Sequence, residues 1–173
     1  MRPLIVREEI KSWQGKPKEL VVNLTEKVSK DNTLFAQVIQ LLKTGSKVEK
    51  GTCADVIEQV SSVKPEIIEP YIGDLIEKIN GDLPRVKWGI CRAIGNLAQK
   101  YPSKTEKAIP KLLINTQDEG TVVRWCAAFA ISEIAKNNVA SQGLLKVKMQ
   151  ELVAAERNNG VRNVYLKALK KIK

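Results

Sequence analysis

A thirteen-residue segment recurs along this chain at almost constant spacing. Residues 123–135 match residues 86–98, which stand 37 positions earlier, with Val, a basic residue and Trp at equivalent places in both. A third copy begins at Val161, 38 positions after Val123. Repetition with such a period is typical of an array in which each unit buries its apolar face only by stacking on its neighbours.

The repeated segment has the pattern of an α-helix. Its apolar side chains recur at spacings of three and four: Val123, Ala127, Ala130, Ile131 and Ile134. The earlier copy carries Gly89 and Gly95, and each glycine costs roughly 1 kcal/mol relative to alanine inside a helix. We therefore expect a neighbouring helix to approach closely at these two positions.

A second apolar segment precedes each copy, and a short polar turn joins the two. Residues 108–114 precede the turn 117–120, and residues 70–76 precede the turn 80–82. Gly, Asn and Asp in these turns tolerate unusual backbone angles or cap the next helix. The same reading along the chain predicts helices over 3–14, 18–30, a stretch that ends before Gly45, about 49–63, 66–79, 83–100, 105–116, 120–137, 143–156 and 159–172.

The best-preserved unit resembles a known family. Two segments are similar to a HEAT repeat. The first is the series Pro110-x-Leu112-Leu113, Asp118 and Val123-Arg124-x-x-Ala127-Ala128-x-Ala130-Ile131-x-x-Ile134, and the second is Val86-Lys87 followed by Ala93-Ile94-Gly95-x-Leu97. The resemblance is strong over 65–137, fair over 144–172 and weak before residue 65. It implies an all-α fold, a right-handed α-α superhelix of the armadillo-like solenoid class, with about ten helices in five pairs.

The resemblance also implies an arrangement for these pairs, with first helices on the convex side and second helices on the concave side. We expect one domain over residues 1–173. Residues 1–45 depart most from the repeat pattern and are predicted to be atypical N-terminal capping helices, because a terminal repeat must cover an otherwise exposed apolar face.

Positive charge is concentrated in the second half of the chain. Residues 1–80 carry 12 basic and 12 acidic side chains, whereas residues 81–173 carry 17 basic and 7 acidic ones. This asymmetry favours an acidic partner, with nucleic acid as an alternative. Solubility of a lysine-rich helical surface explains it equally well.

The remaining composition indicates a cytoplasmic protein without a membrane span. No apolar run approaches 18 residues. Cys53, Cys91 and Cys126 have neither the number nor the spacing of a disulfide framework, so we expect small buried side chains in a reducing compartment.

Recognisable catalytic motifs are absent from the sequence. The chain has no histidine, which excludes Ser-His and Cys-His nucleophiles and histidine metal sites. Its glycines form neither a P-loop nor a dinucleotide fingerprint. We therefore expect no catalytic residue, cofactor or metal. Alkylpurine DNA glycosylases do use HEAT-like repeats, and Trp88, Trp125, Arg92 and Asp55 are similar in type to their residues. However, no acid lies one turn from either tryptophan.

Alignment of the second helices places large and polar side chains on one continuous strip. Under the HEAT resemblance this strip faces the concave groove, and exposed aromatic groups there are typical of binding sites. The predicted partner-binding residues are Trp88, Arg92, Asn96, Trp125, Phe129, Asn163 and Lys167. Trp88 and Trp125 fit equally well as core residues between repeats. The leading hypothesis is a non-enzymatic scaffold that binds an acidic protein or peptide.

The position just before the first residue of this strip carries a cation in three successive repeats: Lys87, Arg124 and Arg162. We call these three residues the cation column. One interpretation is contact with phosphate groups or an acidic partner. The other is a structural ladder, in which each cation bonds a turn acid such as Asp82 or Asp118.

Overall fold

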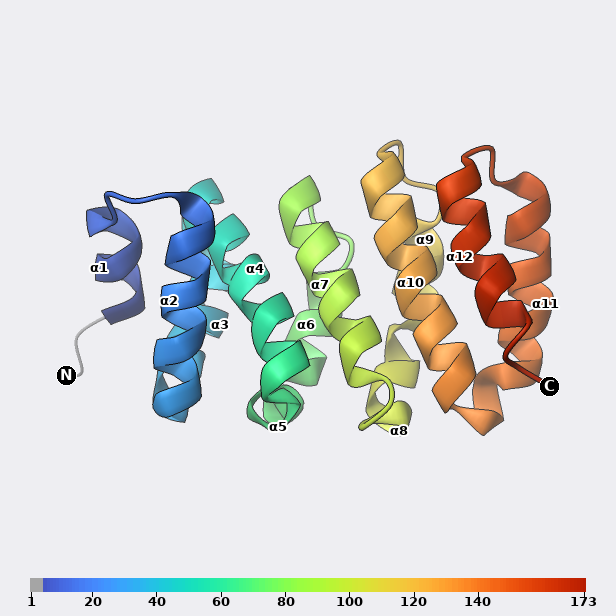
Figure 1. Ribbon diagram of the computed structural model, residues 1–173, viewed down its shortest axis with the longest axis horizontal. Coiled ribbons are helices and arrows are strands. Elements are labelled where there is room, and N and C mark those ends of the chain that lie inside the picture. The colour runs from blue at the N-terminus through green and yellow to red at the C-terminus, as the bar shows by residue number, and fades with distance from the viewer. Residues whose placement is uncertain (1–4) are drawn as a thin grey trace.

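The computed structural model describes residues 5–173, and within this range the chain forms helices and no strand. The helices pair in chain order, and the pairs stack side by side along the longest axis (Figure 1). The second helices of the pairs form one row: α2 (Pro17–Lys30), α4 (Lys47–Val63), α7 (Pro84–Leu97), α10 (Thr121–Asn137) and α12 (Asn159–Leu169). The predicted all-α solenoid of paired helices is confirmed.

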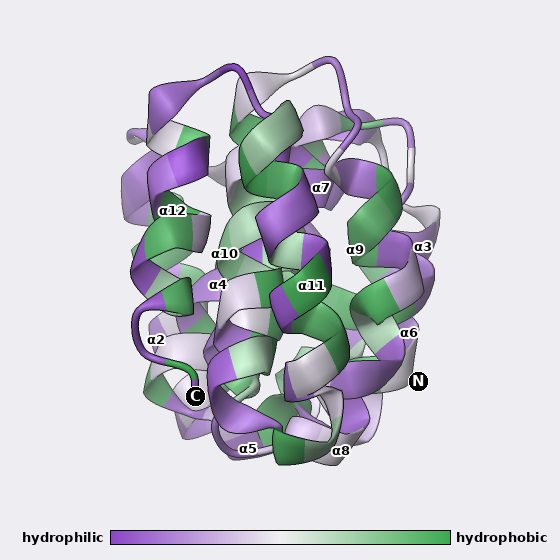
Figure 2. Ribbon diagram, turned by 90° about the vertical axis from the view of Figure 1, so that its right-hand side faces the viewer, coloured by the Kyte–Doolittle hydropathy of each residue, from purple (hydrophilic) through white to green (hydrophobic). Residues whose placement is uncertain are grey.

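The first helices form the other row: α1 (Ile5–Ser12), α3 (Phe35–Thr44), α5 (Pro65–Ile68), α6 (Ile72–Glu77), α8 (Pro102–Thr105), α9 (Ile109–Asn115) and α11 (Val139–Ala155). Viewed from the C-terminal end, α12 and α2 lie on one side of the molecule and α9, α6 and α3 on the other (Figure 2). The predicted start of the first helix at residue 3 lies outside the described residues.

Two first helices are broken where a continuous helix was predicted. The stretch predicted over 66–79 consists of α5, a 3-10 turn (Glu69–Tyr71) and α6. The stretch predicted over 105–116 begins at the last residue of α8 and continues through a 3-10 turn (Glu106–Ala108) into α9. Pro70 lies in the first of these 3-10 turns and Pro110 in the first turn of α9. Proline lacks the N–H that a continuing helix needs and tolerates the first turn of a new one, which accounts for both breaks.

The ninth predicted helix begins earlier than expected, at Val139 rather than at residue 143. The Asn138 side chain caps it by accepting a hydrogen bond from the backbone N–H of Ser141 at 3.0 Å. The Asn138 amide also donates to Glu106 Oε2 at 2.8 Å, so the cap fixes α11 against the preceding pair.

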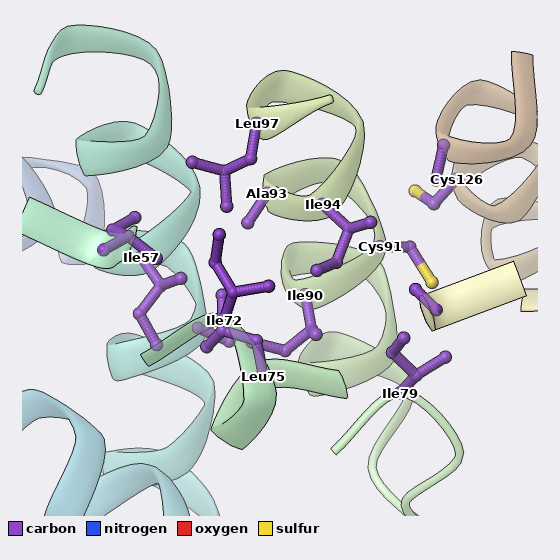
Figure 3. Close-up of a cluster of buried hydrophobic side chains, with 14 of the residues drawn as sticks. Ile57, Ile72, Leu75, Ile79, Ile90, Cys91, Ala93, Ile94, Leu97 and Cys126 are labelled. Atoms are coloured by element: carbon purple, nitrogen blue, oxygen red, sulfur yellow. The ribbon is translucent and has the colours of Figure 1, made fainter. Parts of the chain in front are cut away.

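A continuous apolar core runs between the two rows. In its centre, Ile90, Ile94 and Leu97 of α7 meet Ile57 of α4 and Leu75 of α6, and all five are completely buried (Figure 3). Burial of such side chains is the main stabilising contribution, at about 1.5–3 kcal/mol for each one. Since every pair shares this core with its neighbours, the second-helix row is held in a fixed register.

Glycine allows the second helices to approach one another closely. A Cβ atom on Gly89 would lie 2.8 Å from the carbonyl oxygen of Ala54 in α4. A Cβ atom on Gly95 would lie 2.5 Å from Phe129 and 3.2 Å from the Cα of Ala130 in α10. The close packing predicted for Gly89 and Gly95 is thus confirmed, with one contact on each side of α7.

Candidate functional site

An aromatic pair stands on the second-helix row at α10. Trp125 and Phe129 are one helical turn apart, so both project from the same side of the helix. Their rings are nearly parallel, with an angle of 6° between planes and 5.9 Å between centroids. Both side chains are half-buried, which leaves apolar surface open beside α10.

Arg92 of α7 packs on this aromatic pair. Its guanidinium carbon lies 5.4 Å from the ring centroid of Trp125 and 5.5 Å from that of Phe129, within the range of a cation–π contact. Its Nε atom also lies 2.8 Å from Glu58 Oε1 of α4, although the N–H is not aligned with that oxygen. Arg92 therefore connects three successive second helices.

The carboxyl group of Glu58 is partly buried beside Arg92. Burial raises the pKa of its carboxyl group, the Arg92 charge opposes the rise, and the Asp55 charge adds to it. Asp55 itself is held by Arg85, whose Nη2 lies 2.6 Å from Asp55 Oδ2. Asp55 and Glu58 of α4 are thus both paired with cations of α7.

A small hollow lies between α10 and α12, and we call it the C-terminal hollow. Its volume is about 230 Å³. Its lining combines apolar and cationic side chains: Trp125, Phe129, Ser132, Glu133, Lys136, Val164, Lys167, Ala168 and Lys171. Lys136 pairs with Glu133 at 2.5 Å, whereas Lys167 and Lys171 form no ion pair within residues 5–173.

Trp88, which shares a sequence column with Trp125, lines a different hollow. It is 37% exposed and stands near the N-terminal end of α7. The hollow beside it, about 720 Å³ in volume, is also bordered by the exposed side chains of Ile114 and Val122. We call it the turn-side hollow. The two tryptophans therefore line two separate hollows.

The other predicted groove residues have distinct environments. Asn96 donates to Ser61 Oγ at 3.0 Å and Ser62 Oγ at 3.2 Å, so it joins α7 to α4. Asn163 is exposed and stands one turn before Lys167 on α12, and it does not line the C-terminal hollow.

The cation column forms a ladder along the turns. Lys87 Nζ lies 2.7 Å from Asp118 Oδ2 in the next repeat. Arg124 binds both carboxylate oxygens of Glu156, at 3.1 and 3.3 Å, and donates to the carbonyl oxygens of Asp118 and Glu119. At the end of the array, Arg162 donates to Asn159 Oδ1 at 2.7 Å and to the carbonyl oxygen of Glu156.

The ladder lowers the pKa of its two carboxyl groups. Burial acts to raise the pKa of Asp118, but hydrogen bonds from Lys87 and from the Gly120 N–H, with the nearby positive charges, outweigh it. The same balance applies to Glu156. Burial acts to raise its pKa, but the Arg124 hydrogen bond, the backbone donors and the Arg124 charge outweigh burial and lower the pKa. Both groups are therefore ionised in the folded protein at neutral pH.

Acidification is expected to destabilise the fold through these two groups. Because their folded pKa values lie below the ordinary 3.8 and 4.5, the unfolded chain binds protons more readily. Their stabilising contribution is complete above the ordinary values and is lost as pH falls through the folded ones. Urea unfolding from pH 7 down to pH about 3 measures the effect.

The double variant Asp118→Asn/Glu156→Gln tests the assignment. Its stability at pH 7 sets a baseline, and its loss of stability on acidification should be smaller than that of the wild-type chain. Glu58 contributes in the opposite direction, because its folded pKa is raised. An acid-induced loss of stability that is equal in both proteins would contradict the role of the ladder.

The three thiols lie in the core and are poor nucleophiles. Cys53, Cys91 and Cys126 are free and buried, as predicted. Burial raises the pKa of Cys91 to about 11 and that of Cys53 and Cys126 to about 12. At neutral pH very little thiolate is present, and the thiolate is the reactive form.

Two further properties concern the part of the chain that the structure describes. No group of three or more acidic or thiol side chains in residues 5–173 is placed to hold a metal ion. None of the helices there combines the length and the hydrophobicity that crossing a bilayer demands.

Several residues of this region were not among the predicted site residues. Lys136, Val164 and Lys171 line the C-terminal hollow, and Glu58 pairs with Arg92. Lys171 could have been found, since it stands four positions after Lys167 in the sequence that predicts the last helix. Glu58 could not, because its pairing depends on how far α7 is shifted along α4.

Comparison with known proteins identifies the fold. Neither protein-family models nor curated proteins match the sequence. An engineered protein of known structure superposes with a TM-score of 0.76 at 19% identity, covering 98% of this chain and 80% of its own. A designed armadillo repeat protein gives 0.70 at 18% identity over 90% of this chain and 69% of its own.

A designed armadillo repeat protein in complex with the peptide (KR)4 superposes with a TM-score of 0.69 at 19% identity, covering 97% of this chain and 80% of its own. At these identities the likeness concerns the backbone arrangement. Together with the recurring helix pairs, it shows that this chain has the fold of the armadillo- and HEAT-like repeat solenoids.

Proposed function

We propose that this protein is a non-enzymatic scaffold that binds a protein or peptide segment on its second-helix row. The observation that carries the proposal is the half-buried aromatic pair Trp125 and Phe129 beside the C-terminal hollow. Aromatic side chains next to a hollow are typical anchors of a binding interface. The buried thiols are in keeping with a reducing, cytoplasmic setting.

The contacts of the polar residues support binding rather than catalysis. Asp55 is held by Arg85, and Glu58 is paired with Arg92, so neither carboxylate stands free beside a tryptophan. The designed relatives in fold include a protein in complex with a peptide, which supports a peptide ligand in general. An assay for base release from alkylated DNA, with no release expected, tests the glycosylase alternative.

Selection from a random peptide library is the direct test of the proposal. We expect peptides that bind the wild-type chain to bind Trp125→Ala and Phe129→Ala at least tenfold more weakly, since truncation of an interface anchor costs about 2 kcal/mol or more. Trp13→Ala is the matched control, because Trp13 lies between α1 and α2, far along the chain from α10. Circular dichroism verifies that each variant is folded.

Two results would contradict the proposal. One is that no peptide of any composition binds the wild-type chain. The other is that the selected peptides bind the two α10 variants as well as they bind the wild type.

Nucleic-acid binding is the second candidate, and the free lysines Lys167 and Lys171 favour it. Its signature is an affinity for a single-stranded oligonucleotide that falls steeply with salt, since phosphate contacts release counterions. Failure to bind at low ionic strength would remove this candidate.

A further inference from the structure

The size of the C-terminal hollow limits what can enter it. Its volume of about 230 Å³ is below the roughly 300–1,000 Å³ of sites that hold a whole small molecule. Its apolar lining comes from both helices, with Trp125 and Phe129 on α10 and Val164 and Ala168 on α12. The hollow therefore suits a single apolar side chain that belongs to a larger ligand.

The rim of the hollow has an excess of positive charge that the protein itself does not neutralise. The one carboxylate in the lining, Glu133, is paired with Lys136. Lys167 and Lys171 have no ionic partner within residues 5–173. In contrast, Lys87 and Arg124 of the ladder are bound to Asp118 and Glu156. The unpaired charge is thus local to α12 and the turn that follows it, next to the aromatic pair.

The spacing of the two free lysines adds a geometric requirement. Lys167 lies on α12 and Lys171 in the turn that follows its last residue, Leu169, and both line the C-terminal hollow. A partner helix can present two side chains to this rim when they are four residues apart, because their Cβ atoms then lie about 5–6 Å apart on one face. On such a helix, an apolar residue on the neighbouring stripe is placed beside the two acidic ones.

We propose that the C-terminal hollow binds an acidic amphipathic helix of a partner protein. One apolar side chain of this helix enters the hollow, and two carboxylates one turn apart pair with Lys167 and Lys171. The inference rests on the proposed function and names the chemistry of the ligand. It corresponds to the helix-in-groove mode of recognition, with charge complementarity deciding the partner.

The arrangement of the rings favours a peptide over nucleic acid. Bases bind by stacking on open aromatic faces. Here Trp125 and Phe129 stack on each other, and the Arg92 guanidinium lies over both rings. Stacking surface is thereby reduced, while the ring atoms that line the hollow stay available to an aliphatic side chain.

The test uses an alanine-based helical peptide with two glutamates one turn apart and leucines on the adjacent stripe. Titration of the labelled peptide, followed by fluorescence anisotropy, gives its affinity for the full chain. We expect Lys167→Gln/Lys171→Gln to weaken binding by about tenfold, since two exposed ion pairs are removed. The same peptide with glutamine in place of glutamate should not distinguish wild type from variant.

The matched control is Lys107→Gln/Lys111→Gln. These two lysines are also four residues apart and unpaired in the described chain, but they lie in the first-helix row next to and within α9. If both double variants weaken peptide binding equally, the net charge of the protein explains the effect, and the proposal is overturned. All four lysines lie outside the core, and circular dichroism checks folding.

The outcomes separate this inference from the proposed function. Peptides selected from the library that bind through Phe129 but do not depend on Lys167 and Lys171 would overturn the inference and leave the scaffold function intact. If only an oligonucleotide loses affinity in Lys167→Gln/Lys171→Gln, nucleic acid replaces the acidic helix as the ligand.

Discussion

Replacing Gly89 by valine is expected to lower the free energy of unfolding by about 3 kcal/mol. The Cβ atom would lie 2.8 Å from the Ala54 carbonyl oxygen and 3.0 Å from both the carbonyl carbon and the Cβ atom of Ala54. Most of these neighbours are backbone atoms of α4, which cannot rotate away as a long side chain can. The helices must separate, and the core around Ile57 and Ile90 loses contact.

Gly143→Val is the matched control for this prediction. Gly143 is also inside a helix, α11, but a Cβ atom there would meet nothing within 4 Å. Valine at this exposed position should change stability by no more than about 0.5 kcal/mol. Urea unfolding of the two variants measures the difference. Equal stabilities would mean that α4 and α7 are not in tight contact at Gly89.

The stacking of helix pairs could be predicted because its causes lie within each repeat. Small residues at equivalent places, such as Gly89 and Cys126, mark the faces on which neighbouring helices pack, and both are buried. The breaks at Pro70 and Pro110 were missed for a local reason. Apolar residues keep helical spacing on both sides of each proline, so the pattern alone reads as one continuous helix.

The site was less predictable because it depends on contacts between repeats. Trp88 and Trp125 are equivalent in sequence, but their neighbours are not. Trp88 has Val122 beside its hollow, whereas Trp125 has Val164 and Lys167 of the last pair. A column in an alignment of repeats fixes the helix face of a residue, and the next helix decides its environment.

Replacing Arg124 by methionine is expected to destabilise the protein by about 2–4 kcal/mol at pH 7. Methionine keeps much of the apolar volume but leaves the carboxylate of Glu156, whose side chain is only 8% exposed, without its cation. The carbonyl oxygens of Asp118 and Glu119 lose their donor as well. Thermal or urea unfolding measures the loss.

The matched control is Lys148→Met, which removes an exposed ion pair. Lys148 and Glu151 are 44% and 62% exposed, and such pairs contribute about 0–1 kcal/mol. The second variant, Arg124→Met/Glu156→Leu, should recover part of the stability lost in Arg124→Met, because it removes the uncompensated charge. If Arg124→Met costs no more than Lys148→Met, the pair is structurally unimportant.

The pH dependence of the Arg124→Met effect distinguishes lost charge pairing from lost packing. Without the Arg124 hydrogen bond and charge, two of the influences that lower the pKa of Glu156 are gone, so its folded pKa should rise from its lowered value. On acidification, the wild-type chain then loses more of the stabilising contribution of ionised Glu156 than the variant does. The stability gap between wild type and Arg124→Met should therefore narrow as the pH falls from 7 toward about 4. A gap that stays constant would assign the loss to packing of the arginine side chain instead.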